Sequence, residues 1–328
     1  TNLATGVRII EQNFDAPTPG AIPSGTVIED NAFNASVAVG VHSDSPEVVD
    51  ASPNWWGSPD GPSADRLIGS VLYNPYWINP EMTLLSGAMG TNVTQGTQFW
   101  DLHTAIAAAD PGDQLVVNAG TFVVTSTLLL DKAITIEGVE GARLEVSGAG
   151  PIFDMAAGAT LKNLEIEKTD KVGTIVTLRS SGVELLDNEF HGRYTMGDPE
   201  VSRAIIVNAG GFSDVAITGN TFHHLRQPAY ISGFHEGLIS ENYVYHTRGW
   251  VIENGNFTFE DNTWGIGADA NAVDIAILAT VNPEYYTDVP ALSAANNNAI
   301  VEDQRGGTNL LSVVYVDKDA APGGDGTP

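Results

Sequence analysis

Histidine and arginine are concentrated between residues 179 and 248 of this chain. Five of the seven histidines and five of the nine arginines lie in this segment. A histidine can act as a general base near neutral pH, and an arginine can bind a carboxylate through two parallel hydrogen bonds. The segment also contains the carboxylates of Asp187, Glu189, Glu236, Glu241 and Glu253. It therefore holds the residue types needed to bind or cleave an acidic polymer.

Several of these residues recur at a fixed distance from an asparagine. One group lies three residues after an asparagine: His191, His223 and Tyr245. Others follow at four to six residues. If the asparagines occupy successive turns of a repeat, these side chains line up on one face at about 5 Å per turn. The candidates for binding a carbohydrate are His191, Arg193, His223, Arg226, Tyr245 and Arg248. The candidates for catalysis are His224, His246, Arg248 and Glu236.

A structural role fits the same residues. On the outer face of an acidic repeat protein, His, Tyr and Arg side chains balance the surface charge and connect neighbouring turns. The segment shows neither an arginine-centred lyase motif nor a matched His-Asp-Ser set. We therefore favour a non-catalytic role. Hydrolysis by two carboxylates about 5–9 Å apart stays open as the alternative.

The asparagines belong to a short repeat. Its pattern is two apolar residues in alternation, then Asn, then an apolar or aromatic residue. The Asn position falls at 188, 220, 242 and 262, and an apolar residue occupies it at 139 and 164. Alternation predicts strands, and a unit of about 22 residues is too short to bury its own apolar face, so the units must stack. Asn tolerates left-handed backbone geometry at a corner, and stacked amides can hydrogen-bond between turns. The repeat thus predicts an all-β parallel β-helix.

A longer repeat indicates two units in tandem. Three runs recur after a shift of 208 residues: Gly6–Phe14 as Asp214–Phe222, Asn54–Gly57 as Asn262–Gly265, and Asn74-Pro75 as Asn282-Pro283. We expect 1–90 to hold the last coils of a first unit with a tryptophan-rich end cap, and 91–300 to hold a complete second unit. Residues 301–328 would be a linker or the start of a further element.

The ends of the coil carry two further expectations. An amphipathic helix is predicted over 97–109, because Phe99, Leu102, Ile106 and Ala109 fall on one face. Such a helix would cover the open end of the second unit. At the other unit, Thr1 begins inside a strand pattern, so an open first turn could accept another protomer head to tail.

Two motifs resemble those of secreted right-handed parallel β-helix proteins, a group associated with cell surfaces and polysaccharides. Ile106–Asp113 with Val116–Phe122 is similar to the opening of such a domain, and Asn54–Pro62 is similar to its closing motif. The tail Tyr315–Pro328 is similar to the lead-in of another such domain. The resemblance implies a right-handed β-helix. It does not choose a function, because the group includes polysaccharide lyases, epimerases, phage tailspikes, adhesins and structural proteins.

Composition excludes several functions. Lys and Arg number 14 against 41 Asp and Glu, so the formal charge is 14 − 41 = −27, which argues against a nucleic-acid partner. With no cysteine there is no disulfide, thiolate zinc site or cysteine nucleophile. The sequence contains no run of about 18 apolar residues, so we expect no transmembrane segment.

Two kinds of modification or ligand site are suggested by short motifs. Acidic turns offer oxygen ligands for calcium, although without the spacing of a twelve-residue calcium loop. Their candidate ligands are Asp60, Asp317, Asp319 and Asp325, and no other cofactor is expected. Glycosylation sequons occur at Asn34, Asn92 and Asn256, of which Asn34 and Asn92 are the better candidates.

These patterns favour an extracellular or cell-surface protein with a structural or adhesive role. We expect a rigid segment of a filament or surface layer, associating with other copies of itself head to tail or laterally. The alternative is a β-helix protein that binds or cleaves acidic polysaccharides in the manner of a lyase or epimerase.

Overall fold

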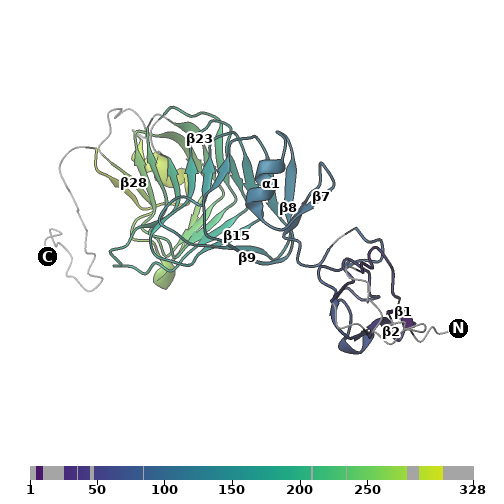
Figure 1. The fold of residues 1–328 in the computed structure, drawn as a ribbon. Coiled ribbons are helices and arrows are strands. Elements are labelled where there is room, and N and C mark those ends of the chain that lie inside the picture. The colour runs from purple at the N-terminus through teal and green to yellow at the C-terminus, as the bar shows by residue number, and fades with distance from the viewer. Residues whose placement is uncertain are drawn as a thin grey trace, which may run out of the picture. The chain divides into compact units, whose positions relative to one another are not determined.

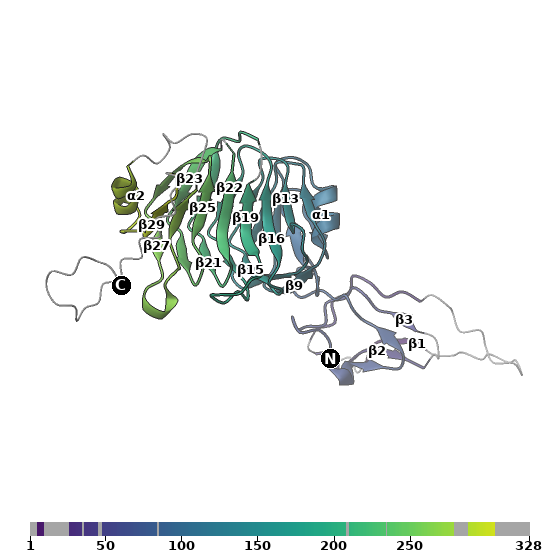
Figure 2. The same ribbon diagram turned by 90° about the vertical axis from the view of Figure 1, so that its left-hand side faces the viewer.

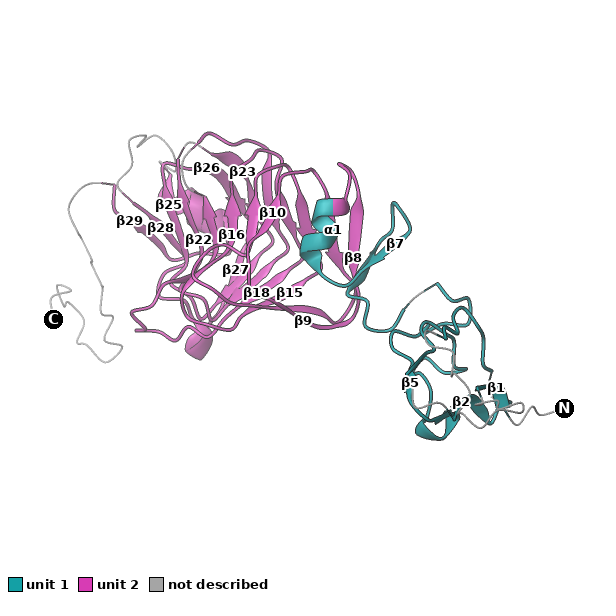
Figure 3. Ribbon diagram, in the orientation of Figure 1, with its two compact units in different colours: residues 1–107 teal, residues 108–328 magenta. Residues whose placement is uncertain are grey.

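The chain folds into a parallel β-helix of about 10 turns. The computed structural model describes residues 5–9, 26–34, 36–44, 48–83, 85–207, 210–233, 235–278 and 288–305. Within these residues there are only two α-helices, α1 (Leu102–Ala108) and α2 (Val289–Ala295). Two compact units divide the chain, residues 1–107 and 108–328 (Figure 3). The predicted all-β parallel β-helix class is confirmed.

Three parallel sheets run along the second unit (Figures 1 and 2). Its first sheet contains β8 (Gln114–Val117), β11 (Thr135–Gly138), β14 (Thr160–Lys162), β17 (Glu184–Leu186), β20 (Val215–Thr218), β23 (Glu236–Ser240) and β26 (Asn256–Glu260). The second sheet contains β9 (Gly120–Val124), β12 (Ala142–Val146), β15 (Glu165–Lys168), β18 (Glu189–His191), β21 (Thr221–His223), β24 (Tyr243–Tyr245) and β27 (Thr263–Trp264). The third sheet contains β10 (Leu128–Leu130), β13 (Phe153–Met155), β16 (Gly173–Leu178), β19 (Ser202–Val207), β22 (Gln227–Ser232), β25 (Trp250–Glu253), β28 (Ile275–Ile277) and β29 (Val301–Asp303).

Apolar side chains that share a register position stack inside the coil. In the first sheet Leu161 pairs with Leu185 and Leu185 with Ile217, and all three are fully buried. In the second sheet Phe190 stacks on Phe222 with ring centroids 5.2 Å apart. Many strands alternate buried and outward residues, as β12 does along Ala142–Val146, and present their polar residues to solvent.

An asparagine ladder runs between the first and second sheets. The Oδ1 atom of Asn220 accepts from the backbone N–H of Asn188 at 2.9 Å, and that of Asn242 accepts from Asn220 at 3.0 Å. The Nδ2 amide of Asn220 donates to the carbonyl of Leu185, one turn earlier, at 2.7 Å. The buried members are Asn188, Asn220, Asn242, Asn262 and Asn296. The predicted turn-to-turn bonding of the asparagines is confirmed.

The left-handed residue at each corner is not the asparagine itself. Positive φ occurs one position earlier, at Asn163, Asp187, Gly219, Glu241 and Asp261, with values of 54° to 71°. The ladder asparagine instead keeps ordinary geometry, which points its side chain into the coil. The expectation that Asn supplies the left-handed geometry was therefore wrong by one residue.

The first unit is a smaller coil of the same kind. Its sheets contain β1 (Thr5–Ile9), β2 (Val39–Ser43) and β4 (Leu67–Ile68), and separately β3 (Val49–Asp50) and β5 (Val71–Leu72). The backbone N–H of Asn31 donates to Asn54 Oδ1 at 2.8 Å, as in the ladder of the second unit. Trp56 is buried and stacks on Phe33 at 4.8 Å.

One of the three long-range matches does not hold. β2 follows Asn31 by 39 − 31 = 8 residues, just as the third-sheet strand β25 follows Asn242 by 250 − 242 = 8. Because β1 pairs with β2, it corresponds to the third sheet, whereas β20 lies in the first. The match of 6–14 with 214–222 was wrong. The match of Asn54 with Asn262 agrees with their shared ladder position, and Asn282-Pro283 lies outside the described residues.

The helix expected over 97–109 is shorter than predicted. Residues 97–99 form β7 (Thr97–Phe99), which pairs antiparallel with β6 (Gly90–Asn92). The helix α1 starts only at Leu102, because the Asp101 carboxylate accepts from the backbone N–H of Thr104 at 2.9 Å and caps the first turn. Its apolar face buries Leu102, Ala105 and Ile106. Its role as a cover for the coil stays a prediction.

The second helix, α2, covers the last strand of the first sheet and was not predicted. It lies at one end of the coil, against β26 and β29 (Figure 2). Asn296, which follows the helix, accepts from Asn262 Nδ2 at 2.7 Å and donates to the carbonyl of Phe259 at 2.9 Å. The ladder is thereby completed from within the chain. Neither helix, and no other described part, offers a helical span long and apolar enough to cross a membrane.

Candidate functional site

The outer face of the second sheet brings three predicted residues together. His191 pairs in register with His223, and His223 with Tyr245. Their rings stack face to face, with centroids 4.9 Å and 4.7 Å apart. Tyr243 stacks on Tyr245 at 5.0 Å. Because these faces cover one another, His223 and Tyr245 present mainly ring edges to solvent, so Tyr245, a candidate for binding a carbohydrate, is poorly placed to stack on a sugar ring.

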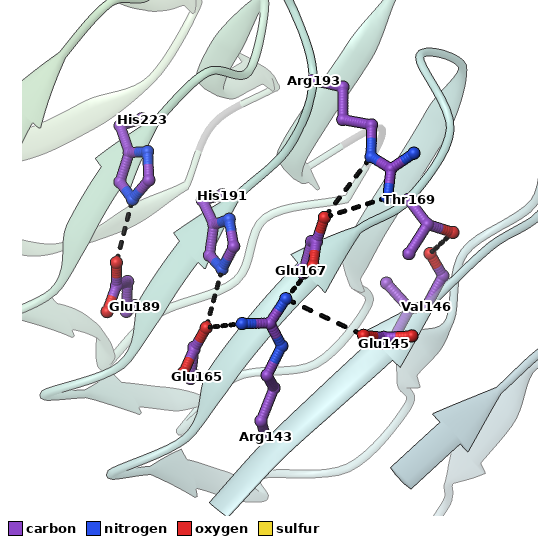
Figure 4. Close-up of polar contacts among 10 residues, drawn as sticks. All are labelled: Arg143, Glu145, Val146, Glu165, Glu167, Thr169, Glu189, His191, Arg193 and His223. Atoms are coloured by element: carbon purple, nitrogen blue, oxygen red, sulfur yellow. Dashed lines mark hydrogen bonds and ion pairs between the residues drawn. The ribbon is translucent and has the colours of Figure 1, made fainter. Parts of the chain in front are cut away.

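Carboxylates from neighbouring strands bind the two stacked histidines (Figure 4). The Nε2 atom of His191 lies 3.1 Å from Glu165 Oε1, and that of His223 lies 2.9 Å from Glu189 Oε1. Arg143 also donates to Glu165, at 2.7 Å, and contacts Glu167. These contacts form an alternating row of acid and base across successive turns.

Arg193, a predicted carbohydrate-binding residue, belongs to this same row. Its guanidinium lies 3.3 Å from Glu167 Oε1 (Figure 4). In the sequence Arg193 follows its asparagine by five residues, whereas Arg226 and Arg248 follow theirs by six, and in the structure Arg193 reaches a carboxylate of the preceding turn. Its charge is therefore already compensated within the chain.

The corner after the second sheet holds a chain of hydrogen-bonded histidines: His223, His224 and His246. His224 and His246 both have φ of 51°, which turns their rings toward each other. The Nδ1 atoms of His223 and His224 lie 2.7 Å apart, and His224 Nε2 lies 3.1 Å from His246 Nδ1. At the far end His246 Nε2 lies 2.9 Å from the carbonyl of Ala268 and 3.3 Å from Asp269 Oδ1.

Burial lowers the pKa of two members of this histidine chain. For His223 the desolvation is partly offset by the hydrogen bond to Glu189, and for His224 it is reinforced by the neighbouring His223. Both rings therefore favour the neutral form that a general base requires. Their nitrogens, however, are occupied by one another, by Glu189 and by His246, so neither ring holds a free nitrogen for a substrate.

Glu236, the fourth catalytic candidate, lies elsewhere. It begins β23 in the first sheet, where it is exposed and accepts weakly from Asn256 at 3.5 Å. Neither His224 nor His246 contacts it. The candidate acid and the candidate bases are thus on different faces of the coil.

Arginines on three successive turns lie where the second sheet gives way to the third; we call Arg203, Arg226 and Arg248 the arginine corner. Arg203 Nε donates to Gln227 Oε1 at 2.6 Å, and its guanidinium lies 5.3 Å from the ring centre of Tyr230. Arg226 Nη1 donates to the carbonyl of Pro199 at 3.2 Å. Burial, and then the charge of Arg226, lower the pKa of Arg203.

The acidic residues form a hollow at a different corner, between the first and second sheets. It measures about 480 Å³, and the carboxylates lining it are Glu140, Glu165, Asp187 and Glu189. Two of these already bind His191 and His223. Across the described residues no three or more His, Asp or Glu side chains are arranged to hold a metal ion. Asp60 is exposed, and the other calcium candidates, Asp317, Asp319 and Asp325, lie outside the described residues.

The three glycosylation sequons differ in accessibility. Asn34 and Asn256 are exposed. Asn92 is 4% exposed, and its Oδ1 accepts from the backbone of Thr94 and Gln95. A glycan on Asn92 would break this turn, so the structure favours Asn256 over Asn92, which reverses the expected order.

Two arginines of this region were missed as candidates. Arg143 alternates with buried Ala142 and Leu144, which predicts an outward position, but its acidic partners depend on the register between strands. Arg203 had no signal beyond its place in the arginine-rich segment.

Comparisons with known proteins leave the family open. No protein-family model matches the chain. No curated protein matches it significantly. No solved structure does so either.

Proposed function

We propose that this protein is a rigid, non-catalytic structural or adhesive segment that acts outside the cell or at its surface. The observation that carries the proposal is that polar side chains connect consecutive turns both inside and outside the coil. Inside, the asparagine ladder bonds each turn to the next. Outside, ion pairs do the same, as between Arg179, directly after β16, and Asp154 on β13 at 2.5 Å.

The candidate catalytic groups support a structural role. A hydrolase needs two carboxylates, or a base and an acid, that converge on one bond of the substrate. Here Glu165 and Glu189 bind histidines, Glu167 binds arginines, and Glu236 lies on another face. The carboxylates of Glu165, Glu167 and Glu189 are thus already bound to side chains of neighbouring turns.

The net charge of the chain supports the proposed location, and the covered end of the second unit bears on how copies would associate. A net charge of −27 with few lysines fits a surface exposed to salt and to water outside the cell. Self-association is part of the proposal. Because α2 already covers the edge of β26, we favour lateral contact over head-to-tail stacking at that end of the second unit.

The proposal is tested by incubating the full chain with a panel of acidic and neutral polysaccharides. We expect no shortened chains and no unsaturated ends after prolonged incubation. Limited proteolysis should leave the second unit intact, since a coil bonded at every turn offers few sites for cleavage. Degradation of any polymer that disappears in the variant His224→Ala would overturn the structural role.

Binding of a polysaccharide without cleavage is the second candidate function. The arginine corner favours it, because its side chains are not used to connect acidic groups of neighbouring turns. This role is compatible with adhesion.

A further inference from the structure

The Lys and Arg side chains of the described residues fall into three groups. Most lie within 4 Å of a carboxylate: Arg8, Arg143, Lys162, Lys168, Lys171, Arg179, Arg193 and Arg305. Arg66 and Lys132 bind backbone carbonyls. The three members of the arginine corner have no ion pair with any carboxylate that the structure describes. In a chain with about three acids for each base, such a group is unusual.

The corner is built from adjacent turns. The N–H of Arg226 donates to the carbonyl of Ser202, and the N–H of Arg248 donates to the carbonyl of Arg226 at 2.8 Å. Successive turns of a parallel coil are about 4.8 Å apart, so the three arginines form a short row along this corner. Arg248 is exposed, and no side-chain partner for it occurs among the described residues.

Internal contacts hold the row in place without neutralising it. Gln227 and the ring of Tyr230 position Arg203, and both are uncharged. Glu253 is bound to Tyr230 and not to the arginines: it accepts from the hydroxyl of Tyr230 at 2.7 Å. Arg226 keeps its Nε buried without a hydrogen-bond partner among the described residues. Like charges held together in this way gain stability when an anion binds between them.

We propose that the arginine corner, formed by Arg203, Arg226 and Arg248, binds the oxyanions of an acidic glycan. The row offers planar guanidiniums, which bind carboxylate or sulfate through paired hydrogen bonds. A linear glycan that carries one oxyanion on each or every second sugar can meet more than one turn of the coil. The inference rests on the adhesive part of the proposed function and names the ligand class.

The net charge of the chain favours an acidic glycan over other polyanions as the ligand of the arginine corner. A nucleic acid carries a charge about every 1.7 Å along its axis, and three arginines are too few to offset its repulsion from a protein of charge −27. A glycan with widely spaced charges and neutral hydroxyls between them is repelled least.

The test measures binding of the full chain to polygalacturonate and to a sulfated glycan, with dextran as the neutral polymer of similar length. The variant is Arg226→Gln with Arg248→Gln. The matched control is Arg179→Gln with Arg193→Gln, which removes the same charge from two arginines that are already paired. We expect the first variant to weaken binding by about 100-fold, at about 10-fold for each guanidinium, and the control by less than about 2-fold. Binding should also weaken between about 0.15 M and about 1 M salt.

Several outcomes would overturn the site. These are equal losses in the two variants, no binding of either acidic polymer, or binding of dextran as tightly as of the acidic polymers. Self-association that depends on Arg226 and Arg248 in the absence of glycan would assign the corner to a second copy instead. If the double variant melts at a lower temperature, the exposed single change Arg248→Gln replaces it, with an expected loss of about 10-fold. Cleavage of the polymer would overturn the non-catalytic function, whereas absence of binding without cleavage overturns the site alone.

Discussion

The Nδ1 atoms of His223 and His224 lie 2.7 Å apart, so one of these two rings must hold a proton between them. Three imidazoles make four contacts along the histidine chain, from Glu189 at one end to the carbonyl of Ala268 at the other. Both end groups accept only, so four protons are needed, whereas three neutral rings carry three. The chain is completed only when it takes up one further proton.

We expect this proton to enter in a single shared step. Because burial lowers the pKa values of His223 and His224, uptake should occur below about pH 6.5, the ordinary value for histidine. Nitrogen NMR shifts of both rings should then move together. In His246→Gln the amide supplies its own donor, so the two remaining rings need no extra proton and the joint step should be lost. His103→Gln, on α1, is the control and should leave it unchanged. Independent titrations of His223 and His224 would contradict the shared proton.

The burial of His235 predicts the direction in which the free energy of unfolding changes with pH. It is fully buried, accepts from the N–H of Phe212 at 3.2 Å, and donates to the carbonyl of Ser232 at 2.8 Å, which requires the neutral ring. Burial lowers its pKa in the folded state, so the unfolded chain binds more protons below about pH 6.5. The free energy of unfolding should therefore be highest above that pH and fall as the pH drops toward the folded pKa. Urea titrations of wild type and His235→Gln should show a smaller fall in the variant, by at most about 1.4 kcal/mol per pH unit. An unchanged pH slope would count against this role.

The asparagine ladder should contribute strongly to stability at Asn220. The change Asn220→Ala leaves the N–H of Asn188 and the carbonyl of Leu185 buried without their partners. We expect the free energy of unfolding to fall by about 2–5 kcal/mol, measured by urea denaturation. The exposed Asn256→Ala is the matched control and should cost less than about 0.5 kcal/mol. Similar losses at both positions would show that the ladder contributes little.

Removal of the α2 cover should promote association. Asn296→Ala breaks the contacts to Asn262 and Phe259, and leaves the edge of β26 open to another chain. Sedimentation velocity should then show larger species as concentration rises. Asn298→Gly is the control, since glycine accepts the φ of 60° at that exposed position. A monomeric Asn296→Ala chain at high concentration would mean that α2 does not protect this edge.

The sequence predicts the coil well because its inward positions repeat. The slots at 164, 188, 220, 242 and 262 lie at equivalent corners, and even Leu164, which lacks the amide, offers its N–H to Asn188 at 3.1 Å. The alternation of apolar and polar residues can be seen within a single strand, so the sequence predicts which side chains point inward. The sequence also carries a start signal for α2, since Asp288 caps the helix and Pro290 follows in its first turn.

The candidate site was predicted less completely, because its chemistry depends on neighbours. The column of His191, His223 and Tyr245 follows from a constant distance to the ladder, and the structure contains it. Whether an arginine is paired depends on which acid lies one turn away. Arg193 and Arg226 looked alike in the sequence, yet only Arg193 has a carboxylate, Glu167, within reach.

The side chains of the ladder asparagines bond within their own turn or to the turns on either side, and this has a consequence for how such a protein can change its length. A duplicated turn would find the same partners above and below, so the coil could grow or shrink in steps of about 4.8 Å without redesign of the remaining turns. The number of residues per turn already varies, since the interval from Asn188 to Asn220 is 32 residues and that from Asn242 to Asn262 is 20. Duplication of single turns would therefore lengthen the coil by one fixed step each time.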